Sequence, residues 1–516
     1  MARMQVDDHG APIAAAPAVE SAGAKAGCSF LLAATVALLL ARIPILFVRA
    51  FDNDEFEHTH AAWSVFRGLL PYKDFFEHHT PWYYFALSPF FRWFAVDRSF
   101  DAARHFLIFG RFVSLALTAV SVILIFVVGR LGATRRVALL GALFLAGQPI
   151  LIHKTLEIRP DVPALTFFVA ALGLLRHGLL VEQATRGRTL RWFLGGGLCL
   201  GAAIMCTQKL LFALPGVLVG LGLWTLAGDR RGRLTRISAV LVLLSGVGLP
   251  GLVTWIAFAR HGAGTQFIYD NFILNAHWKW HSGRHLLKVV TSSGPILLLC
   301  LVGARFALSR PTRVEKLMSG DVLCLCTLAG LVAGLLVVPA AYEQYYLPLL
   351  AIASLFAARG LSVLLDLRRK REARPGRLLV YATLVFLIWP AVDLARALGR
   401  RNDVQMARLQ FVFAHTGPSD PVLDGWLGMD VFRPQPLYYS FMHRELQVTL
   451  SEREKDAYVD ALTTGKVRPA LIALDDELRA LGPRLVSYVE RNYVSSDGVL
   501  YLPVQPASPA RASTTP

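Results

Sequence analysis

The sequence predicts an α-helical protein that crosses a membrane many times, with helices at the membrane surface in its first outer loop and a small α/β domain at its carboxy terminus. The composition is one reason, because 54% of the 516 residues are hydrophobic and only 17% are charged. The mean hydropathy is +0.47. The second reason is that about eleven apolar stretches, each close to the 20 residues that span a bilayer as a helix, precede Arg400.

The predicted spans follow one another within residues 29–398, which we expect to form one membrane domain. Residues 1–28 are rich in alanine and show no apolar periodicity, so they are predicted to be a disordered cytoplasmic tail. The first span runs from Phe30 to Val48, and the others begin near Phe106, Val137, Pro160, Trp192, Leu210, Ile237, Ile296, Val322, Leu347 and Leu378.

Basic residues predict the orientation, because short loops rich in Lys and Arg stay in the cytoplasm. They gather in alternate loops, at residues 130–136, 186–191, 230–236, 310–316 and 368–377. The net charge of +17 is therefore interpreted as a topology signal, which argues against nucleic acid as a partner. With an odd number of spans, the loop 50–105 and the segment after Arg400 are both expected outside.

The first outer loop, residues 50–105, carries two predicted amphipathic helices that suit the membrane interface. One covers residues 55–69, where apolar side chains recur near helical spacing, and Pro81 can start the second, which continues to Phe94. Gly68 and Pro71 mark the break between them. Asp52 or Asn53 is a suitable N-cap for the first helix.

Residues 399–505 predict a small soluble α/β domain. Apolar runs at 421–427, 470–474 and 499–504 are typical of short strands, and residues 450–462 and 481–493 of helices. Ser451 followed by Glu454 is a capping-box pattern. Residues 506–516 are rich in Pro, Ala, Ser and Thr and are predicted to be disordered.

Three polar residues at the start of the first outer loop are candidates for chemistry. Asp54 and His58 are four residues apart, so on a helix they share a face, and Glu55 lies beside them. A carboxylate there could act as a general base on a hydroxyl group. The same acids also suit the first turn of a helix, and the two roles are compatible.

Glu77 and His78, with Asp74 before them and His79 after them, form a second polar group in this loop. Carboxylate and imidazole together suit a divalent metal ion, so Glu77 and His78 are candidate ligands. The spacing does not separate this reading from histidines that are only solvated at a wet interface.

Cations at the outer ends of later spans are candidates for holding a phosphate. Lys154 and Arg159 lie between two spans, and Arg presents a planar fork of donors that fits phosphate oxygens. Lys209 lies in another very short outer loop, next to Gln208. The alternative for Lys154 and Arg159 is a polar hairpin with snorkelling cations.

All these groups are predicted on one side of the membrane, together with Glu343 and Tyr345 at the start of a later span. A transporter would place its polar groups near the midplane, in the broken helices of repeated halves, and no such repeat is seen. Convergence at span ends instead favours a catalytic cavity.

The first outer loop resembles that of bacterial GT-C glycosyltransferases through Asp54-Glu55, Gly68, Pro71-Tyr72, Asp74 to His78, and Pro81. The group is the broad dolichyl-phosphate-mannose-protein-mannosyltransferase-like set, which includes aminoarabinose and galacturonic acid transferases acting on lipopolysaccharide. Residues 157–161, 207–209 and 345–348 are similar to that family as well, and the resemblance covers roughly residues 30–398.

The resemblance implies a GT-C fold in a bacterial inner membrane, with the site and the carboxy-terminal domain in the periplasm. It also implies sugar transfer from a polyprenyl phosphate to an envelope glycan, lipid or protein, usually with inversion. Asp54, beside Glu55, would be the catalytic base, and cations would hold the lipid phosphate. The remaining motif residues are candidate substrate-binding residues: His58, Tyr72, Asp74, Asp161, Gln208, Glu343 and Tyr345.

The chain departs from the family pattern after Phe76. Many relatives have an acid, one basic residue and Pro-Pro there, whereas this chain has Glu77-His78-His79-Thr80-Pro81. A lysine that could contact phosphate in some relatives is thus replaced by histidine. Two alternative functions stay open from the sequence: a flippase or transporter of an envelope precursor, and an oligosaccharide ligase or polymerase that uses a pyrophosphate-linked glycan.

Overall fold

The fold is seen in a computed structural model that describes residues 22–181, 186–279, 284–309, 312, 317–338, 341–369 and 375–504. The predicted carboxy-terminal tail, 506–516, lies outside the described residues, and so does most of the predicted amino-terminal tail, 1–28. The first helix, α1, begins at Ala22, inside that predicted tail.

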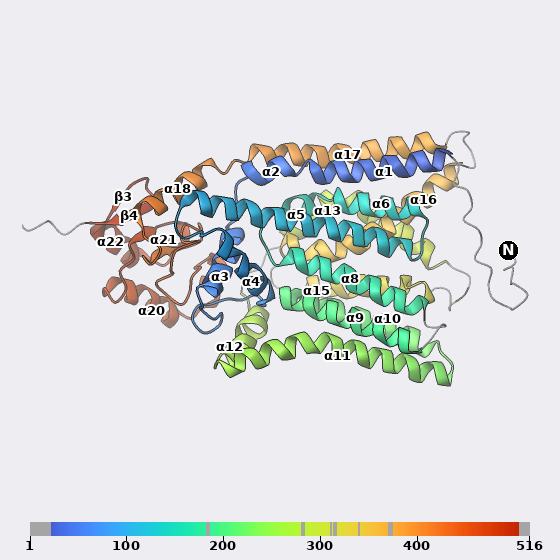
Figure 1. The fold of residues 1–516 in the computed structure, drawn as a ribbon, viewed down its shortest axis with the longest axis horizontal. Helices are drawn as coiled ribbons and strands as arrows, with labels where there is room; N and C mark the ends of the chain where they lie inside the picture. Colours follow the sequence, from blue (N-terminus) through green and yellow to red (C-terminus); the bar gives the residue numbers. More distant parts are fainter. Residues whose placement is uncertain are drawn as a thin grey trace, which may run out of the picture.

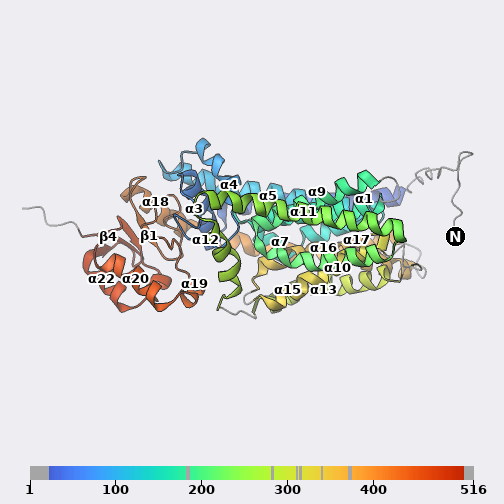
Figure 2. The same ribbon diagram turned by 90° about the horizontal axis from the view of Figure 1, so that it is seen from below.

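The molecule is elongated and has two parts (Figures 1 and 2). Long helices run side by side along most of its length, and the carboxy-terminal domain covers one end of the bundle, next to α3 and α4. We call this the domain end. Its neighbours α3 (Asn53–Phe66) and α4 (Trp82–Leu87) come from the first loop, so two segments far apart in the sequence share this end.

The chain is a multi-pass membrane protein, because nine helical segments among the described residues are long and apolar enough to cross a membrane. They are α1 (Ala22–Leu40) with α2 (Ile43–Val48), α5 (Phe100–Arg130), α8 (Asp161–Leu180), α9 (Arg186–Cys206), α10 (Ala213–Leu226) with η2 (Gln208–Phe212), α11 (Arg230–Arg260), α13 (Arg284–Ala307), α16 (Leu347–Arg369) and α17 (Pro375–Gly399).

Nine candidate spans replace the about eleven that the sequence predicts from stretches of spanning length. The predicted span from Val137 is broken near Gly147 into α6 (Arg135–Ala146) and α7 (Pro149–Lys154). Pro149 starts α7, as proline does at a first helical position. The other difference is α15 (Asp321–Val337), which has only 17 residues. Both segments lie inside the bundle but are individually too short to count as spans.

Helix α16 is the most enclosed span, with 72% of its apolar window buried inside the protein. It packs closely on α13 because glycines face each other at the crossing. A Cβ on Gly303 would overlap the carbonyl oxygen of Phe356, and one on Gly360 would overlap that of Leu299. Small residues let membrane helices approach in this way. A rigid α16 in turn fixes η4 (Glu343–Tyr346), which precedes it at the domain end.

The predicted helices of the first loop are present, as α3 and as α4 followed by η1 (Ser88–Trp93). The Asp52 carboxylate accepts the Asp54 N–H, and the Glu55 carboxylate accepts the Asp52 N–H. This reciprocal capping box confirms Asp52 as the N-cap and sets where α3 begins. Helix α3 is buried along most of its length rather than lying free at an interface.

The carboxy-terminal domain is a small mixed sheet with helices, as predicted, in the order β1-β2-β4-β3. Strands β1 and β2 are parallel, and the other pairs are antiparallel. The predicted capping box of Ser451 and Glu454 is confirmed at α20. Its elements are α18 (Asp403–His415), β1 (Val422–Asp424), α19 (Arg444–Thr449), α20 (Glu452–Thr463), β2 (Leu471–Ala473), α21 (Asp476–Arg479), α22 (Pro483–Asn492), β3 (Tyr493–Ser495) and β4 (Leu500–Pro503).

The domain is fastened to the first loop by hydrogen bonds. The Phe76 N–H donates to the carbonyl oxygen of Tyr438 at 2.8 Å, and His60 Nδ1 lies 3.1 Å from the carbonyl oxygen of Asp430. A third segment, α12 (Gly264–Ile268) followed by η3 (Tyr269–Leu274), packs beside them. The Tyr438 hydroxyl lies 3.5 Å from an Asp270 carboxylate oxygen. Three parts of the chain therefore meet at the domain end.

Candidate functional site

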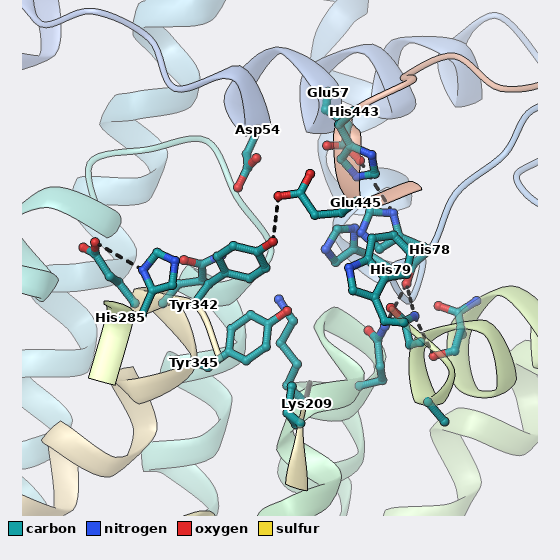
Figure 3. Close-up of a pocket in the computed structure, with 18 of the residues that line it drawn as sticks. Asp54, Glu57, His78, His79, Lys209, His285, Tyr342, Tyr345, His443 and Glu445 are labelled. Carbon is teal, nitrogen blue, oxygen red and sulfur yellow. Dashed lines mark hydrogen bonds and ion pairs between the residues drawn. The ribbon is translucent and has the colours of Figure 1, made fainter. Parts of the chain in front are cut away.

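A cavity of about 920 Å³ lies at the domain end, where these parts meet (Figure 3). Its wall combines the first loop, the ends of several spans, the segment around η3 and the carboxy-terminal domain. Of the residues predicted from the sequence to be functional, seven line it: Asp54, His78, Lys154, Gln208 and Lys209, together with Glu343 and Tyr345 at η4.

Asp54 reaches the cavity from the first turn of α3, and its side chain is 26% exposed. Behind it lies Arg159, which is 1% exposed and pairs with the carboxylates of Asp54, Glu157 and Asp161. Three acids around one guanidinium hold Asp54 in place through its ion pair. Arg159 itself is not among the residues that line the cavity.

Glu157 is the centre of this network. It accepts from Arg49 at 2.8 Å and from Lys154 at 3.1 Å, in addition to Arg159. Burial would raise the pKa of Glu157, but Lys154, Arg159 and Arg49 together hold that pKa below its ordinary value. Lys154 also pairs with Asp52 at 3.0 Å. Each carboxylate of the network thus has a cation within reach.

Glu55 is turned away from the cavity, although the sequence names it beside Asp54 as catalytic. It is fully buried, and Arg111 donates to its two oxygens at 2.9 and 2.7 Å. The Asp52 and Ile158 N–H groups also donate to it. Because its oxygens are already engaged, Glu55 fixes the start of α3 and is not placed to take a substrate proton.

Lys209 and Tyr345 form the side of the cavity nearest the spans. The Lys209 ammonium lies 3.8 Å from the centre of the Tyr345 ring and 3.8 Å from an Asp161 oxygen. Gln208 donates to the His78 carbonyl oxygen at 2.7 Å, which ties η2 to the first loop. Figure 3 shows Lys209 and Tyr345 on one side of the cavity and His78 and His79 on another.

Three predicted substrate-binding residues of the first loop do not line the cavity. His58 is buried beside Tyr84, with its Nδ1 3.2 Å from the Tyr84 hydroxyl. Tyr72 has a positive φ of 66° and donates its hydroxyl to the His79 carbonyl oxygen at 2.6 Å. Asp74 accepts the Leu70 N–H at 2.7 Å and so closes a turn. These residues shape the loop that carries His78 and His79.

Glu57, Glu77, His78 and His79 form a candidate metal group. Each offers a ligand atom, and the four atoms lie within 4.8 Å of one another. Burial, followed by the nearby Glu77 and Asp54, raises the pKa of Glu57 well above its ordinary value. Burial lowers the pKa of His79 to about 3, so this imidazole is neutral and keeps a lone pair for a cation. Two carboxylates and two neutral imidazoles suit a divalent transition metal ion.

From the sequence, Glu77 and His78 are named as ligands with His79 beside them, whereas Glu57 is missed. A signal for Glu57 exists, because it lies three residues after Asp54 and shares a face of α3 with it. A different set has no such signal. It comes from docking of the carboxy-terminal domain, and comprises Trp426, His443, Arg444, Glu445 and Glu477.

Comparison with known proteins shows which solved structures have a similar fold. No curated protein sequence matches the chain. The profile of the family described as dolichyl-phosphate-mannose-protein mannosyltransferase matches residues 103–257. Among solved structures, ArnT from Cupriavidus metallidurans bound to undecaprenyl phosphate is 13% identical with a TM-score of 0.64, over 93% of this chain and 98% of that chain.

A second similar structure is the oligosaccharyltransferase AglB from Archaeoglobus fulgidus, in complex with an inhibitory peptide and a dolichol-phosphate. It is 11% identical with a TM-score of 0.56, over 93% of this chain and 75% of that chain. An Archaeoglobus fulgidus oligosaccharyltransferase has also been solved in complex with Zn and sulfate, at 12% identity and a TM-score of 0.52.

The likeness to these structures extends over the membrane part and the carboxy-terminal domain, since it covers 93% of this chain for both ArnT and AglB. At identities of 11% and 13% the likeness concerns the fold. The family profile adds a match of the sequence itself, over residues 103–257. The resemblance drawn from the first loop is thereby confirmed to this extent: residues 103–257 match the model of the dolichyl-phosphate-mannose-protein mannosyltransferase family, and the chain shares the fold of ArnT.

Proposed function

We propose that the protein transfers a sugar, with inversion, from a polyprenyl-phosphate donor to an envelope glycan, lipid or protein. The observation that carries this proposal is that Asp54 and Lys209 face one cavity at the ends of membrane spans. An apolar edge of the same cavity is lined by Leu211, Phe212, Val337 and Val338. A lipid tail suits that edge, and ArnT and AglB were solved with undecaprenyl phosphate and dolichol-phosphate.

The transfer needs one displacement at the anomeric carbon. The acceptor hydroxyl oxygen forms the new bond to that carbon, and its proton passes to the Asp54 carboxylate. The bond from the anomeric carbon to the phosphate oxygen breaks, and its electron pair leaves with the polyprenyl phosphate. Lys209 is placed to neutralise this negative charge as it develops. A single displacement inverts the configuration of the sugar.

The proposal gives Arg159 a different role from the phosphate contact for which the sequence makes it a candidate. Arg159 is buried and already pairs with Asp54, Glu157 and Asp161. A phosphate would have to displace one of those carboxylates to reach it. We therefore assign Arg159 to positioning Asp54, Lys209 to the phosphate, and Lys154 to a secondary contact because it lines the cavity but pairs with two acids.

A divalent cation is part of the proposal. Glu57, Glu77, His78 and His79 would hold it, since their donor atoms converge and their imidazoles are neutral. When bound, such an ion would supply positive charge next to the donor phosphate. The four side chains also pack the first loop against α3, so they have a structural role with or without the ion.

The proposed orientation puts the domain end in the periplasm of a bacterial inner membrane. The described Arg residues of the loops 130–136 and 230–236 lie at the other end of α5 and α11 from the cavity. Short loops of this kind stay in the cytoplasm. A reporter that works only outside the cytoplasm, fused after Gln505, is expected to be active. Activity of a cytoplasm-only reporter at that point would reverse the orientation.

The decisive experiment uses purified protein in proteoliposomes, a panel of synthetic undecaprenyl-phosphate sugars and membranes from a strain that lacks the gene. Wild-type protein should release undecaprenyl phosphate and label the membranes. Asp54→Asn should lower turnover about a hundredfold or more, because it removes the base. Asp101→Asn, at an exposed acid in the first turn of α5, should not lower it.

Each contrary outcome has its own meaning. Near-wild-type turnover of Asp54→Asn would remove Asp54 as the base. Movement of the intact lipid across the bilayer without covalent product would indicate a flippase. Mass spectrometry of the spent carrier separates a monophosphate from a pyrophosphate, and the latter would indicate a ligase or polymerase.

A further inference from the structure

The wall that the carboxy-terminal domain contributes to the cavity has no part in the displacement described above. It is formed by Trp426, by Glu477 of α21 and by the run His443 to Glu445 at the start of α19. Trp278, from the segment after η3, completes it on the side of the spans. We call these six residues the domain wall.

The aromatic members of the domain wall form a continuous series. The ring centres of Trp426 and His443 are 4.4 Å apart, and those of His443 and Trp278 are 5.7 Å apart. Trp278 stacks on His78, with ring centres 5.4 Å apart and planes inclined by 19°. The series therefore runs from the domain to the first loop, beside the candidate metal group.

The polar members add charged side chains beside these rings. Glu445 accepts a hydrogen bond from the Tyr342 hydroxyl at 2.9 Å, which joins the domain to the segment that leads into η4. Arg444 Nε lies 3.6 Å from a Glu477 oxygen. Figure 3 shows Glu445 reaching toward Tyr342, in the same view as Asp54 and His78. Carboxylates and a guanidinium thus border a surface of aromatic rings.

The domain wall and the donor side of the cavity belong to different parts of the molecule. Lys209, Tyr345 and the apolar edge at Leu211 and Val337 belong to span ends, where a membrane-bound donor must enter. The domain wall belongs to the part outside the spans. Asp54 lines the same cavity, so a hydroxyl held by the wall can be presented to it.

We propose that the domain wall binds the acceptor, and that the acceptor presents a carbohydrate there. The inference rests on the proposed sugar transfer and adds the class of acceptor to it. The apolar face of a sugar ring packs on flat aromatic surfaces, and the partly buried Trp426 offers one. The hydroxyl groups of a sugar both donate and accept hydrogen bonds. The carboxylates of Glu445 and Glu477 can accept from them, and the guanidinium of Arg444 can donate to them.

A peptide acceptor fits this wall less well. An extended peptide is commonly recognised by pairing with the open edge of a sheet. Among the described residues, those that line the cavity include none from β1, β2, β3 or β4, so the wall offers side chains rather than a strand edge. The mixture of rings and charges instead suits a polyhydroxylated ligand.

Two variants test the wall with little risk to folding. Glu445→Gln keeps an oxygen that can accept from Tyr342 but loses the charge, and Trp426→Ala removes a half-buried ring. Their matched controls are Glu490→Gln on α22 and Trp93→Ala on η1, both exposed. Thermal unfolding of all four proteins identifies any variant that has simply lost its fold.

The experiment titrates each protein in proteoliposomes with a glycolipid fraction and, separately, a protein fraction from membranes of a strain that lacks the gene. A synthetic undecaprenyl-phosphate sugar is kept in excess. We expect the glycolipid fraction to be labelled, and each wall variant to need about ten times more of it for half-maximal rate. The donor concentration for half-maximal rate should stay within about twofold of wild type.

The outcomes separate the two levels of the proposal. If wild type transfers no sugar from any polyprenyl phosphate, the proposed function itself fails. If wild type transfers sugar while both wall variants saturate normally, only the role of the wall is overturned. A shift in the donor concentration instead would assign the wall to the donor sugar, and labelling of the protein fraction alone would replace carbohydrate by protein as acceptor.

Discussion

Two groups of acids meet at the cavity, and they are built in opposite ways. Behind Asp54, the carboxylates of Asp54, Glu157 and Asp161 surround Arg159, with Lys154 and Arg49 close by. Beside it, the only basic groups of the described residues within ion-pair distance of Glu57 and Glu77 are the imidazoles of His78 and His79. We call the first the compensated group and the second the uncompensated group.

The protonation of the two groups differs accordingly. Cations keep the pKa of Glu157 below its ordinary value despite burial, whereas burial raises the pKa of Glu77. Burial also lowers the pKa of His78, so the nearby imidazoles do not supply positive charge. The compensated group is complete without a ligand and can hold Asp54 rigidly. The uncompensated group lacks positive charge, which is the property expected of a cation site.

The largest effect is expected from Arg159→Met. Removing this guanidinium leaves three carboxylates without their shared cation, and breaking a buried ion pair costs about 3–5 kcal/mol of stability. Asp54 also loses the partner that positions it, so turnover should fall about a hundredfold or more. Thermal unfolding and turnover in proteoliposomes measure the two effects.

Arg159→Lys separates charge from geometry, because lysine keeps the charge but cannot reach three carboxylates in a fork. We expect its turnover to lie between those of Arg159→Met and wild type. Arg104→Lys, on the exposed side of α5, is the matched control and should behave as wild type. Wild-type turnover of Arg159→Met would show that the compensated group does not position the base.

The second effect concerns the uncompensated group. Glu57→Gln removes one carboxylate donor, so affinity for a divalent ion should fall about 10–100-fold. Calorimetric titration of purified, chelator-treated protein with Zn²⁺ or Mn²⁺ measures it, with Glu490→Gln as the control at an exposed acid. Unchanged binding in Glu57→Gln would remove Glu57 as a ligand, and full turnover after chelation would show that the reaction needs no metal.

How far the sequence predicts this site depends on where each residue lies. Asp54, Lys154 and Lys209 follow from charge at the ends of apolar spans, because charge there is costly to desolvate and is visible as a pattern. The small mixed sheet follows from short apolar runs and one capping box. These features depend on residues that are close together in the sequence, so they can be predicted from it.

The features that the sequence does not predict are those that depend on contacts between distant segments. Glu445 and Trp426 reach the cavity only because the carboxy-terminal domain docks on the first loop through Phe76 and Tyr438. The span count differs at Gly147, which lies so close to α17 that a Cβ would meet the Phe386 ring.

The third effect is on stability and concerns the attachment of the domain. Burial raises the pKa of Asp270, beside Tyr438, to about 7. An acid with a raised pKa contributes stability that is fully present below its unfolded pKa of about 4 and is lost as pH rises through about 7. Wild-type protein should therefore lose stability between pH 5 and pH 8.

Between pH 5 and pH 8, the free energy of unfolding of Asp270→Asn should fall on the order of 2 kcal/mol less than that of wild type, because the amide does not ionise. Thermal unfolding at pH 5 and pH 8 measures the difference, and Asp456→Asn, at an exposed acid of α20, is the control. An unchanged pH dependence in Asp270→Asn would mean that ionisation of this acid does not affect the docked domain.

The smallest effect is expected from Lys154→Met, and it sharpens the comparison between the two groups because Lys209, a second lysine of the same cavity, serves as its reference. Lys154 belongs to the compensated group, where Arg49 and Arg159 also pair with Glu157. Lys209 lies over Tyr345 and is 3.8 Å from Asp161, with no closer acid among the described residues. Lys154→Met should therefore lower turnover only a few-fold, and Lys209→Met by about a hundredfold, since it removes preorganised charge at the leaving phosphate. Both are measured with donor in excess. Equal losses would mean that the two lysines share the phosphate, and a larger loss in Lys154→Met would move the phosphate to the compensated group.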